Sequence, residues 1–199
     1  MSDLARFWPA GLDDALRTRL EEAYADSGRG YHDLLHLTEV LHHVDELMPT
    51  DEPARETVLL AAWFHDAVYD GRGDDEERSA LLAEASLPDA AVASEVARLI
   101  RLTRTHRPAP DDVPGQVLCD ADLAVLAAEP DRYASYVRGV RSEYAHVPDA
   151  DFAHGRAAVL RDLLAKPTLF HSDVARSRWE QAARTNVQRE IESLTGSGG

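Results

Sequence analysis

The sequence is poor in lysine and in cysteine, and its charge is strongly one-sided. Its only lysine is Lys166 and its only cysteine is Cys119, in 199 residues with a formal net charge of -15. A single cysteine excludes an internal disulfide and fits a reducing compartment. The acidic balance argues against duplex nucleic acid as a partner, because contacts with phosphate backbones depend on lysine and arginine. A bound anion would need arginine, a helix N-terminus or a cation.

Long hydrophobic runs are also missing. No segment approaches the roughly 20 apolar residues of a membrane span, and the first twenty residues lack the basic stretch and apolar run of a signal peptide. We therefore expect a cytoplasmic protein that does not interact with membranes. The lysine-bearing loop of Walker-type phosphate sites is absent, and neither Cys119 nor any serine lies in a nucleophile motif.

What the chain does have is apolar residues at helical spacing. No run alternates apolar and polar residues as a half-buried strand does. The third predicted segment is apolar on nearly every side after Glu56, as in a central helix. A chain of this length fills one core, so we predict an all-α bundle of eight to nine helices, as one domain over 1–195 with a flexible tail over 196–199. The expected helices cover residues 12–26, 32–48, 53–69, 75–86, 88–105, 116–128, 130–145, 149–165 and 173–194, with a breaker-rich connection over 107–116.

Histidine and aspartate interrupt these apolar segments. His65 and Asp66 are adjacent in "AAWFHDAVYD", where a lone buried carboxylate is costly unless a positive charge compensates it. On the predicted central helix the two side chains would point about 100° apart. His32 and His36 lie four residues apart in the preceding helix and share one face. Each feature alone is common in ordinary proteins, so their joint occurrence is what favours a site.

The segment "LCDADLAVL" contributes two further carboxylates, Asp120 and Asp122. Two residues apart on a helix, they face nearly opposite directions, so we expect only one of them to reach the interior. Imidazole nitrogen and carboxylate oxygen are ligands for a divalent first-row metal or for magnesium. Such a cation would stabilise buried carboxylates in their ionised form.

The order of these residues resembles the HD superfamily of metal-dependent phosphohydrolases, and in particular its bacterial branch of predicted HD phosphohydrolases. This resemblance implies that His36, His65, Asp66 and Asp122 are the metal ligands, with Asp122 preferred because Ala-Asp followed by an apolar residue matches the family pattern. It covers almost the whole chain, through "RGYHDLLHLTEVL", "AAWFHDAVYD", "DDEERSALLA", "LIRLTRTH", "LCDADLAVLA", "YVRGVRSEY" and "ARTNVQREIESL".

"HDAVYD" also resembles the motif of HD alarmone hydrolases, in which two acidic residues follow the doublet. Asp70 occupies the second of those positions, while Tyr69 replaces the first, which argues against alarmone hydrolysis.

Four ligands on a six-coordinate ion leave room for water and a phosphate oxygen, and the ion lowers the pKa of that water. We expect Asp70, or failing that Glu76, to accept the proton; a solvated acidic loop explains Glu76 equally well. The ion could be Mn, Fe, Mg, Co, Ni or Zn.

Four residues are predicted to contact the substrate. Arg29 and Arg104, with Arg107 as an alternative to the latter, could clamp phosphate, because the guanidinium fork matches phosphate oxygens. His32 could orient a metal ligand or cap a helix. His106 could contact the substrate, ligate a second metal or simply end a surface helix.

These observations predict a metal-dependent phosphohydrolase that acts on a small phosphorylated metabolite or nucleotide. One alternative is a regulatory module that binds a nucleotide or metal without turnover. A less favoured one is a di-iron oxygenase of the HD fold, which needs further histidines between the doublet and the last aspartate, where only His106 lies. The C-terminal helix, with Val187, Ile191 and Leu194, could pack on its own core or on a second copy in a homodimer.

Overall fold

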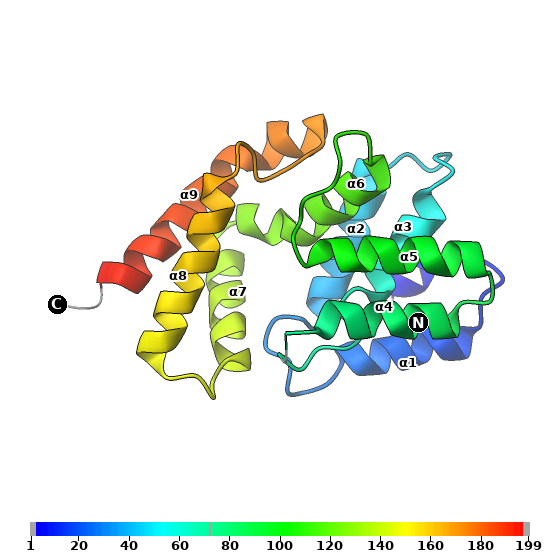
Figure 1. The fold of residues 1–199 in the computed structure, drawn as a ribbon, viewed down its shortest axis with the longest axis horizontal. Coiled ribbons are helices and arrows are strands. Elements are labelled where there is room, and N and C mark those ends of the chain that lie inside the picture. The colour runs from blue at the N-terminus through cyan, green and yellow to red at the C-terminus, as the bar shows by residue number, and fades with distance from the viewer. Residues whose placement is uncertain (1–2, 72, 197–199) are drawn as a thin grey trace.

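Helices make up the regular structure of the chain, seen in a computed structural model that describes residues 3–71 and 73–196 (Figure 1). Nine α-helices, two 3-10 helices and no strand occur within these residues, which confirms the predicted all-α class. None of these helices is both long and apolar enough to cross a membrane. The elements are η1 (Asp3–Phe7), α1 (Asp14–Tyr24), α2 (Leu34–Leu47), α3 (Arg55–Phe64), α4 (Asp75–Ser86), α5 (Ala90–Thr103), α6 (Val113–Leu123), η2 (Ala124–Ala127), α7 (Pro130–Glu143), α8 (Asp149–Ala165) and α9 (Asp173–Gly196).

The start of α6 lies inside the stretch predicted to be a connection. The side chain of Asp112 accepts a hydrogen bond from the main-chain nitrogen of Gly115 at 3.1 Å and so caps the helix. Pro114 is tolerated in the first turn because the N–H that it lacks would have no partner there. At the other end of the chain α9 extends to Gly196, and residues 197–199 of the predicted tail lie outside the described residues.

Two hydrophobic cores divide the molecule into lobes. The first core joins η1 and α1–α6, here called the N-terminal lobe. Its centre is α3, buried at every position from Val58 to Phe64 and packed against α2, α4, α5 and α6. The second core joins η2 and α7–α9, here called the C-terminal lobe, and includes Tyr31 from the N-terminal lobe. Val187 and Ile191 of α9 are buried in this core, so the C-terminal helix packs on its own chain. Figure 1 shows the C-terminal lobe, coloured yellow-green to red, beside the other helices.

A close backbone contact joins the lobes at the loop before α2. A Cβ atom on Gly30 would lie 2.4 Å from the carbonyl oxygen of Gly139 in α7, and a Cβ on Gly139 would lie 2.4 Å from the oxygen of Gly30. Only glycine permits this approach. It places Glu143 of α7 where its Oε1 accepts hydrogen bonds from the main-chain nitrogens of Tyr31 at 2.8 Å and His32 at 2.9 Å. The loop that leads into α2 is therefore held by α7.

Candidate metal centre

The His65-Asp66 doublet lies at the end of α3 and not within the longer helix that the sequence predicted. The helix stops at Phe64, and Arg29 donates to the main-chain oxygens of Asp66 at 2.7 Å and Ala67 at 3.0 Å. These carbonyls would otherwise lack a partner past a helix terminus. The hydroxyl of Tyr24 accepts from the main-chain nitrogen of Asp66 at 3.1 Å. The doublet is thus fixed by residues distant in sequence.

His36 occupies the first turn of α2, where it is 1% exposed. Asp33 caps this helix, because its side chain accepts from the main-chain nitrogens of Leu35 at 2.9 Å and His36 at 3.1 Å. His32 therefore precedes the helix, although its ring centroid still lies 5.6 Å from that of His36. Its Nδ1 lies 2.8 Å from Oε2 of Glu143, which holds the ring in place.

Four side chains converge at the meeting point of α2, α3 and α6. The Nε2 atoms of His36 and His65 are 3.1 Å apart, and Oδ2 of Asp66 lies 3.3 and 3.1 Å from them, respectively. Oδ1 of Asp122 lies 3.3 Å from Nε2 of His36 and 3.6 Å from that of His65. Around an ion with bonds of about 2.1 Å, adjacent ligand atoms are about 3.0 Å apart in an octahedron and about 3.4 Å apart in a tetrahedron. The observed spacings match such a coordination sphere.

The hydrogen-bonding roles of these atoms also call for a metal ion or an additional proton. Nδ1 of His65 lies 2.8 Å from the main-chain oxygen of Ala62, which can only accept, so this nitrogen carries the proton. In the neutral ring Nε2 is then an acceptor, and it faces two carboxylates. Acceptors that converge in a buried place need a metal ion or a proton between them. Among the described residues, His36, His65 and Asp66 are the one group of at least three potential ligands that all lie close enough to one another to share an ion. Asp122 approaches both histidines but is not part of this group.

The electrostatics agree with this requirement. Burial disfavours charge on both imidazoles, yet the two aspartates raise the pKa of His36 above its usual value and that of His65 well above it. Burial likewise opposes ionisation of Asp66 and Asp122, but the surrounding histidines hold the pKa of each carboxyl well below its usual value. The site therefore keeps two ionised carboxylates in an interior position, where protons on the imidazoles or a bound cation can compensate them.

His106 lies next to this centre, whereas the sequence left it as a substrate contact, a second-metal ligand or the end of a surface helix. Its Nε2 lies 2.8 Å from Oδ2 of Asp122, which leaves Oδ1 directed at His36 and His65. The backbone of His106 has a φ of 49°, in the left-handed region that non-glycine residues rarely adopt. Strain of this kind is concentrated at functional sites. A motif search cannot reveal it, because it arises from the turn after α5.

Asp120 has a different role from Asp122. It is fully buried, and its two oxygens accept from the main-chain nitrogens of His171 at 2.7 Å and Ser172 at 2.8 Å. These nitrogens precede α9, so Asp120 anchors the start of that helix. The prediction that only one of the two carboxylates reaches the interior is therefore wrong, since Asp120 is 0% exposed and the side chain of Asp122 is 15% exposed. Asp122 is the one that the structure brings to the histidines, as the sequence favoured.

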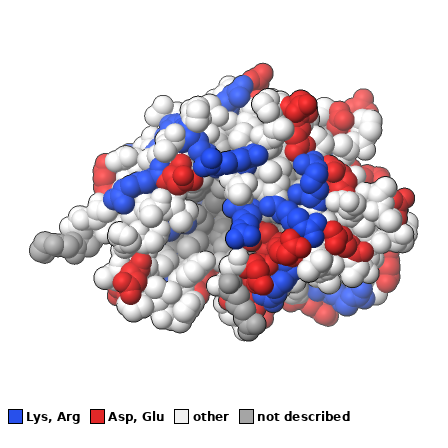
Figure 2. All heavy atoms as spheres, in the orientation of Figure 1, with Lys and Arg blue, Asp and Glu red and all other residues white. Residues whose placement is uncertain are grey.

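A cavity of about 560 Å³ opens beside the centre, between the lobes. Of the other predicted residues, His32, Glu76 and His106 line it. Figure 2 shows a hollow in the middle of the molecule, between α8 and the α4–α5 pair of Figure 1, with basic and acidic side chains interspersed around it. The sequence did not predict the side of the cavity that the C-terminal lobe forms, here called its wall. Members of that wall include Tyr136, Val140, Tyr144, Phe152, Arg156 and Val159.

The remaining predicted residues are not brought to this cavity. Arg29 lines another hollow and uses its guanidinium on main-chain oxygens, so the structure gives it a positioning role and not that of a phosphate clamp. Asp70 forms an ion pair with Arg78 at 2.9 Å. Arg104 is exposed at the end of α5, and Arg107 lies 3.5 Å from Asp162 on the surface.

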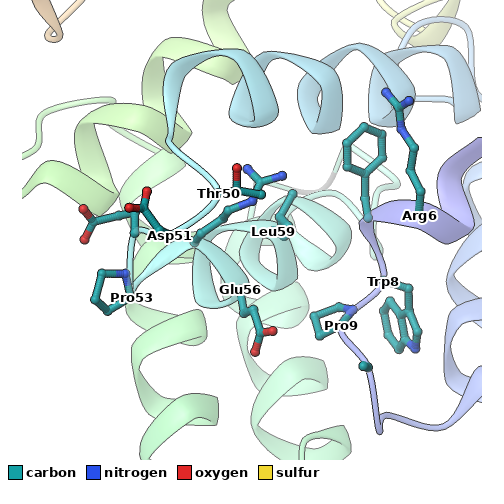
Figure 3. Close-up of a pocket in the computed structure, with 12 residues that line it drawn as sticks. Arg6, Trp8, Pro9, Thr50, Asp51, Pro53, Glu56 and Leu59 are labelled. Carbon is teal, nitrogen blue, oxygen red and sulfur yellow. The ribbon is translucent and has the colours of Figure 1, made fainter.

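A second cavity, of about 430 Å³, lies away from these residues (Figure 3). In Figure 3 Trp8 and Pro9, which follow η1, lie on one side of it, and Asp51 and Pro53 lie on the other. None of the predicted site residues lines this cavity. It therefore offers no comparable centre for chemistry.

In comparisons with family models, curated proteins and solved structures, none matched this chain. The resemblance to the HD superfamily consequently depends on the sequence motifs alone. The chemistry of the site is inferred from its geometry.

Proposed function

We propose that the chain is a metal-dependent phosphohydrolase of the HD type, in which His36, His65, Asp66 and Asp122 bind one divalent ion. The observation that carries this proposal is the convergence of two imidazole nitrogens and two carboxylate oxygens, with separations of 3.1 to 3.6 Å at the histidines. A divalent ion held there would lower the pKa of a bound water and neutralise charge on a phosphoryl oxygen. Mixed nitrogen and oxygen donors suit Mn, Fe, Co, Ni, Zn or Mg.

The protein's own groups orient the site and move the proton. His65 is held by Ala62, and Asp122 by His106, so each presents one defined atom. Glu76 lines the cavity and is the carboxylate we assign as acceptor of the proton from the attacking water. Asp70 is the weaker candidate, because its carboxylate pairs with Arg78 outside this cavity.

The test is phosphate release by protein freed of metal and reloaded with Mn, Mg, Co or Ni. A panel of nucleotides, sugar phosphates and simple phosphoesters should yield product with at least one metal. The variants His65→Ala and Asp66→Ala should lose both activity and bound metal, whereas His154→Ala, on the exposed side of α8, should retain both. Activity that survives both substitutions at the centre would refute the proposal.

The alternatives give different results in the same experiments. A regulatory module would be stabilised by metal and nucleotide without forming product. A di-iron oxygenase would consume oxygen and hold two irons per chain.

A further inference from the structure

The cavity beside the metal centre has two unlike halves. Beside the metal centre its lining includes Asp122, His106 and Tyr31. On the C-terminal lobe the lining is mostly aromatic and aliphatic, with Tyr136, Val140, Tyr144, Phe152 and Val159. A ligand that fills the cavity must therefore be polar at one end and apolar at the other.

The charges of the lining limit the number of phosphoryl groups. Among the described residues, Arg156 is the only arginine or lysine in the lining, and it is already engaged, with Glu190 at 2.8 Å and the hydroxyl of Tyr136 at 2.5 Å. Glu76 and Asp151 also line the cavity and would repel a second anionic group. A phosphoryl group next to the ion can be neutralised, whereas the described lining offers no free cation to one farther out. Polyphosphates are thus poorly matched to this cavity.

Tyr31 presents a hydroxyl that lacks a partner. The residue is 6% exposed, and its buried oxygen makes no hydrogen bond within the described part of the chain. Its ring is packed between His36, at a centroid distance of 4.7 Å, and Tyr136, at 4.6 Å. A buried hydroxyl without a partner costs free energy unless a ligand supplies one. Tyr31 lines the cavity next to a proposed metal ligand, so a phosphoryl oxygen at the ion could accept its proton once binding opens access to this buried oxygen.

We propose that the substrate is a phosphomonoester of a bulky, uncharged, ring-bearing alcohol, bound with its single phosphoryl group at the ion and Tyr31 and its ring against α7 and α8. This inference rests on the proposed function. In the reaction the oxygen of water forms a bond to phosphorus, and the bond from phosphorus to the alcohol oxygen breaks. Glu76 accepts the proton of the water, and the alcohol oxygen takes up a proton as it leaves. The products are inorganic phosphate and the free alcohol.

Binding of phosphonates, which cannot be hydrolysed, tests the pocket independently of turnover. On Mn-loaded protein, calorimetry should show that 1-naphthylmethylphosphonate binds at least about 10-fold more tightly than methylphosphonate, because the ring buries apolar surface. Tripolyphosphate should show no such advantage. Equal affinity of the two phosphonates, or tighter binding of tripolyphosphate, would overturn the inference even if phosphomonoesters were hydrolysed.

Val159→Asp places a charge on the apolar wall with little risk to the fold, since Val159 is 56% exposed. It should raise the KM for 1-naphthyl phosphate about 10-fold more than the KM for methyl phosphate, which is too small to reach this wall. Val174→Asp is the matched control, because Val174 is an exposed valine of α9 that does not line the cavity. An equal effect of the two substitutions, or none from Val159→Asp, would contradict the assigned wall.

Tyr31→Phe removes the hydroxyl alone. We expect kcat/KM to fall about 10- to 100-fold for every phosphomonoester, as for a lost hydrogen bond to a charged group, with unchanged metal content. Unaltered kcat/KM would overturn the role of Tyr31. Tight binding of naphthylmethylphosphonate without phosphate release from naphthyl phosphate would support the pocket assignment and refute the hydrolase.

Discussion

Each lobe contains a buried ionic cluster, and the two clusters are built differently. In the C-terminal lobe Arg156 pairs with Glu190 at 2.8 Å, and the hydroxyl of Tyr133 donates to the same carboxylate at 2.5 Å. Every charge there has a partner of opposite sign within the chain. In the N-terminal lobe His36, His65, Asp66 and Asp122 converge, and their acceptor atoms face one another. The comparison teaches that a cluster of matched charges stabilises a fold, whereas a cluster of converging ligand atoms could hold an ion.

The largest expected effect distinguishes two neighbouring carboxylates. Asp122→Asn should lower phosphate release by about 10³-fold or more, equivalent to about 4 kcal/mol, because the ion loses a charged ligand. Asp120→Asn should leave metal content intact and lower the free energy of unfolding by about 1 to 3 kcal/mol, because it weakens only the anchor of α9. Metal analysis and urea unfolding measure the two effects. Metal loss in Asp120→Asn alone would reverse the assignment.

Breaking the cluster of matched charges should affect stability and not chemistry at the ion. Arg156→Met leaves Glu190, whose side chain is 5% exposed, without its cation and should lower the free energy of unfolding by about 3 kcal/mol. Arg178→Met is the control, because Arg178 pairs with Glu46 at the exposed surface and should contribute less than about 1 kcal/mol. Metal content should be unchanged in both variants. A similar loss of stability in the two would remove the distinction between buried and exposed pairs.

His106 allows a milder change at the metal centre. His106→Asn retains a residue that tolerates positive φ but shortens the side chain that holds Asp122. Affinity for Mn should fall about 10- to 100-fold, the usual cost of losing a group that orients a ligand. His154→Asn, at an exposed position of α8, should bind metal normally. Titration calorimetry measures the affinity of each variant for Mn. Equal affinities in His106→Asn and His154→Asn would show that His106 does not position Asp122.

The smallest effect concerns the contact between the lobes. Burial opposes ionisation of Glu143, but hydrogen bonds from His32 and the main chain lower its pKa to about 2, from an ordinary value of 4.5. A lowered pKa stabilises the fold above pH 4.5, and this contribution is lost as the pH falls toward 2. Between pH 6 and 3.5 the wild type should lose about 1 kcal/mol more than Glu143→Gln. The free energy of unfolding of both proteins is measured across this pH range, and an equal loss in the two would contradict the stabilising role of ionised Glu143.

Much of the fold could be predicted from periodicity alone, because each helix buries a stripe of its own residues. The ends of the helices were less predictable, since they depend on hydrogen-bond partners that are distant in the sequence. Arg29 satisfies carbonyl groups at the end of α3 and so helps to stop the helix before His65, whereas local sequence favoured its continuation. Pro114 was read as a breaker but lies in a capped first turn.

The four proposed metal ligands of the candidate site were predictable for a different reason. The charge of a histidine or an aspartate inside an apolar segment must be compensated when it is buried, and such residues can be recognised in the sequence. Tyr31 and Phe152 carry no such signal, because a buried aromatic residue ordinarily belongs to the core. Only the packing of α7 and α8 against the loop before α2 makes them part of the lining of a cavity. The role of His106 also arises from a turn that periodicity does not reveal.

Metal content is the most direct measurement. Untagged protein purified without chelators or nickel resin should contain one divalent ion per chain by elemental analysis, and His36→Ala should contain essentially none. Wild-type protein that neither retains an ion nor binds one on titration with Mn, Fe, Co, Ni, Zn and Mg would contradict the proposed centre. So would an ion that persists undiminished in His36→Ala.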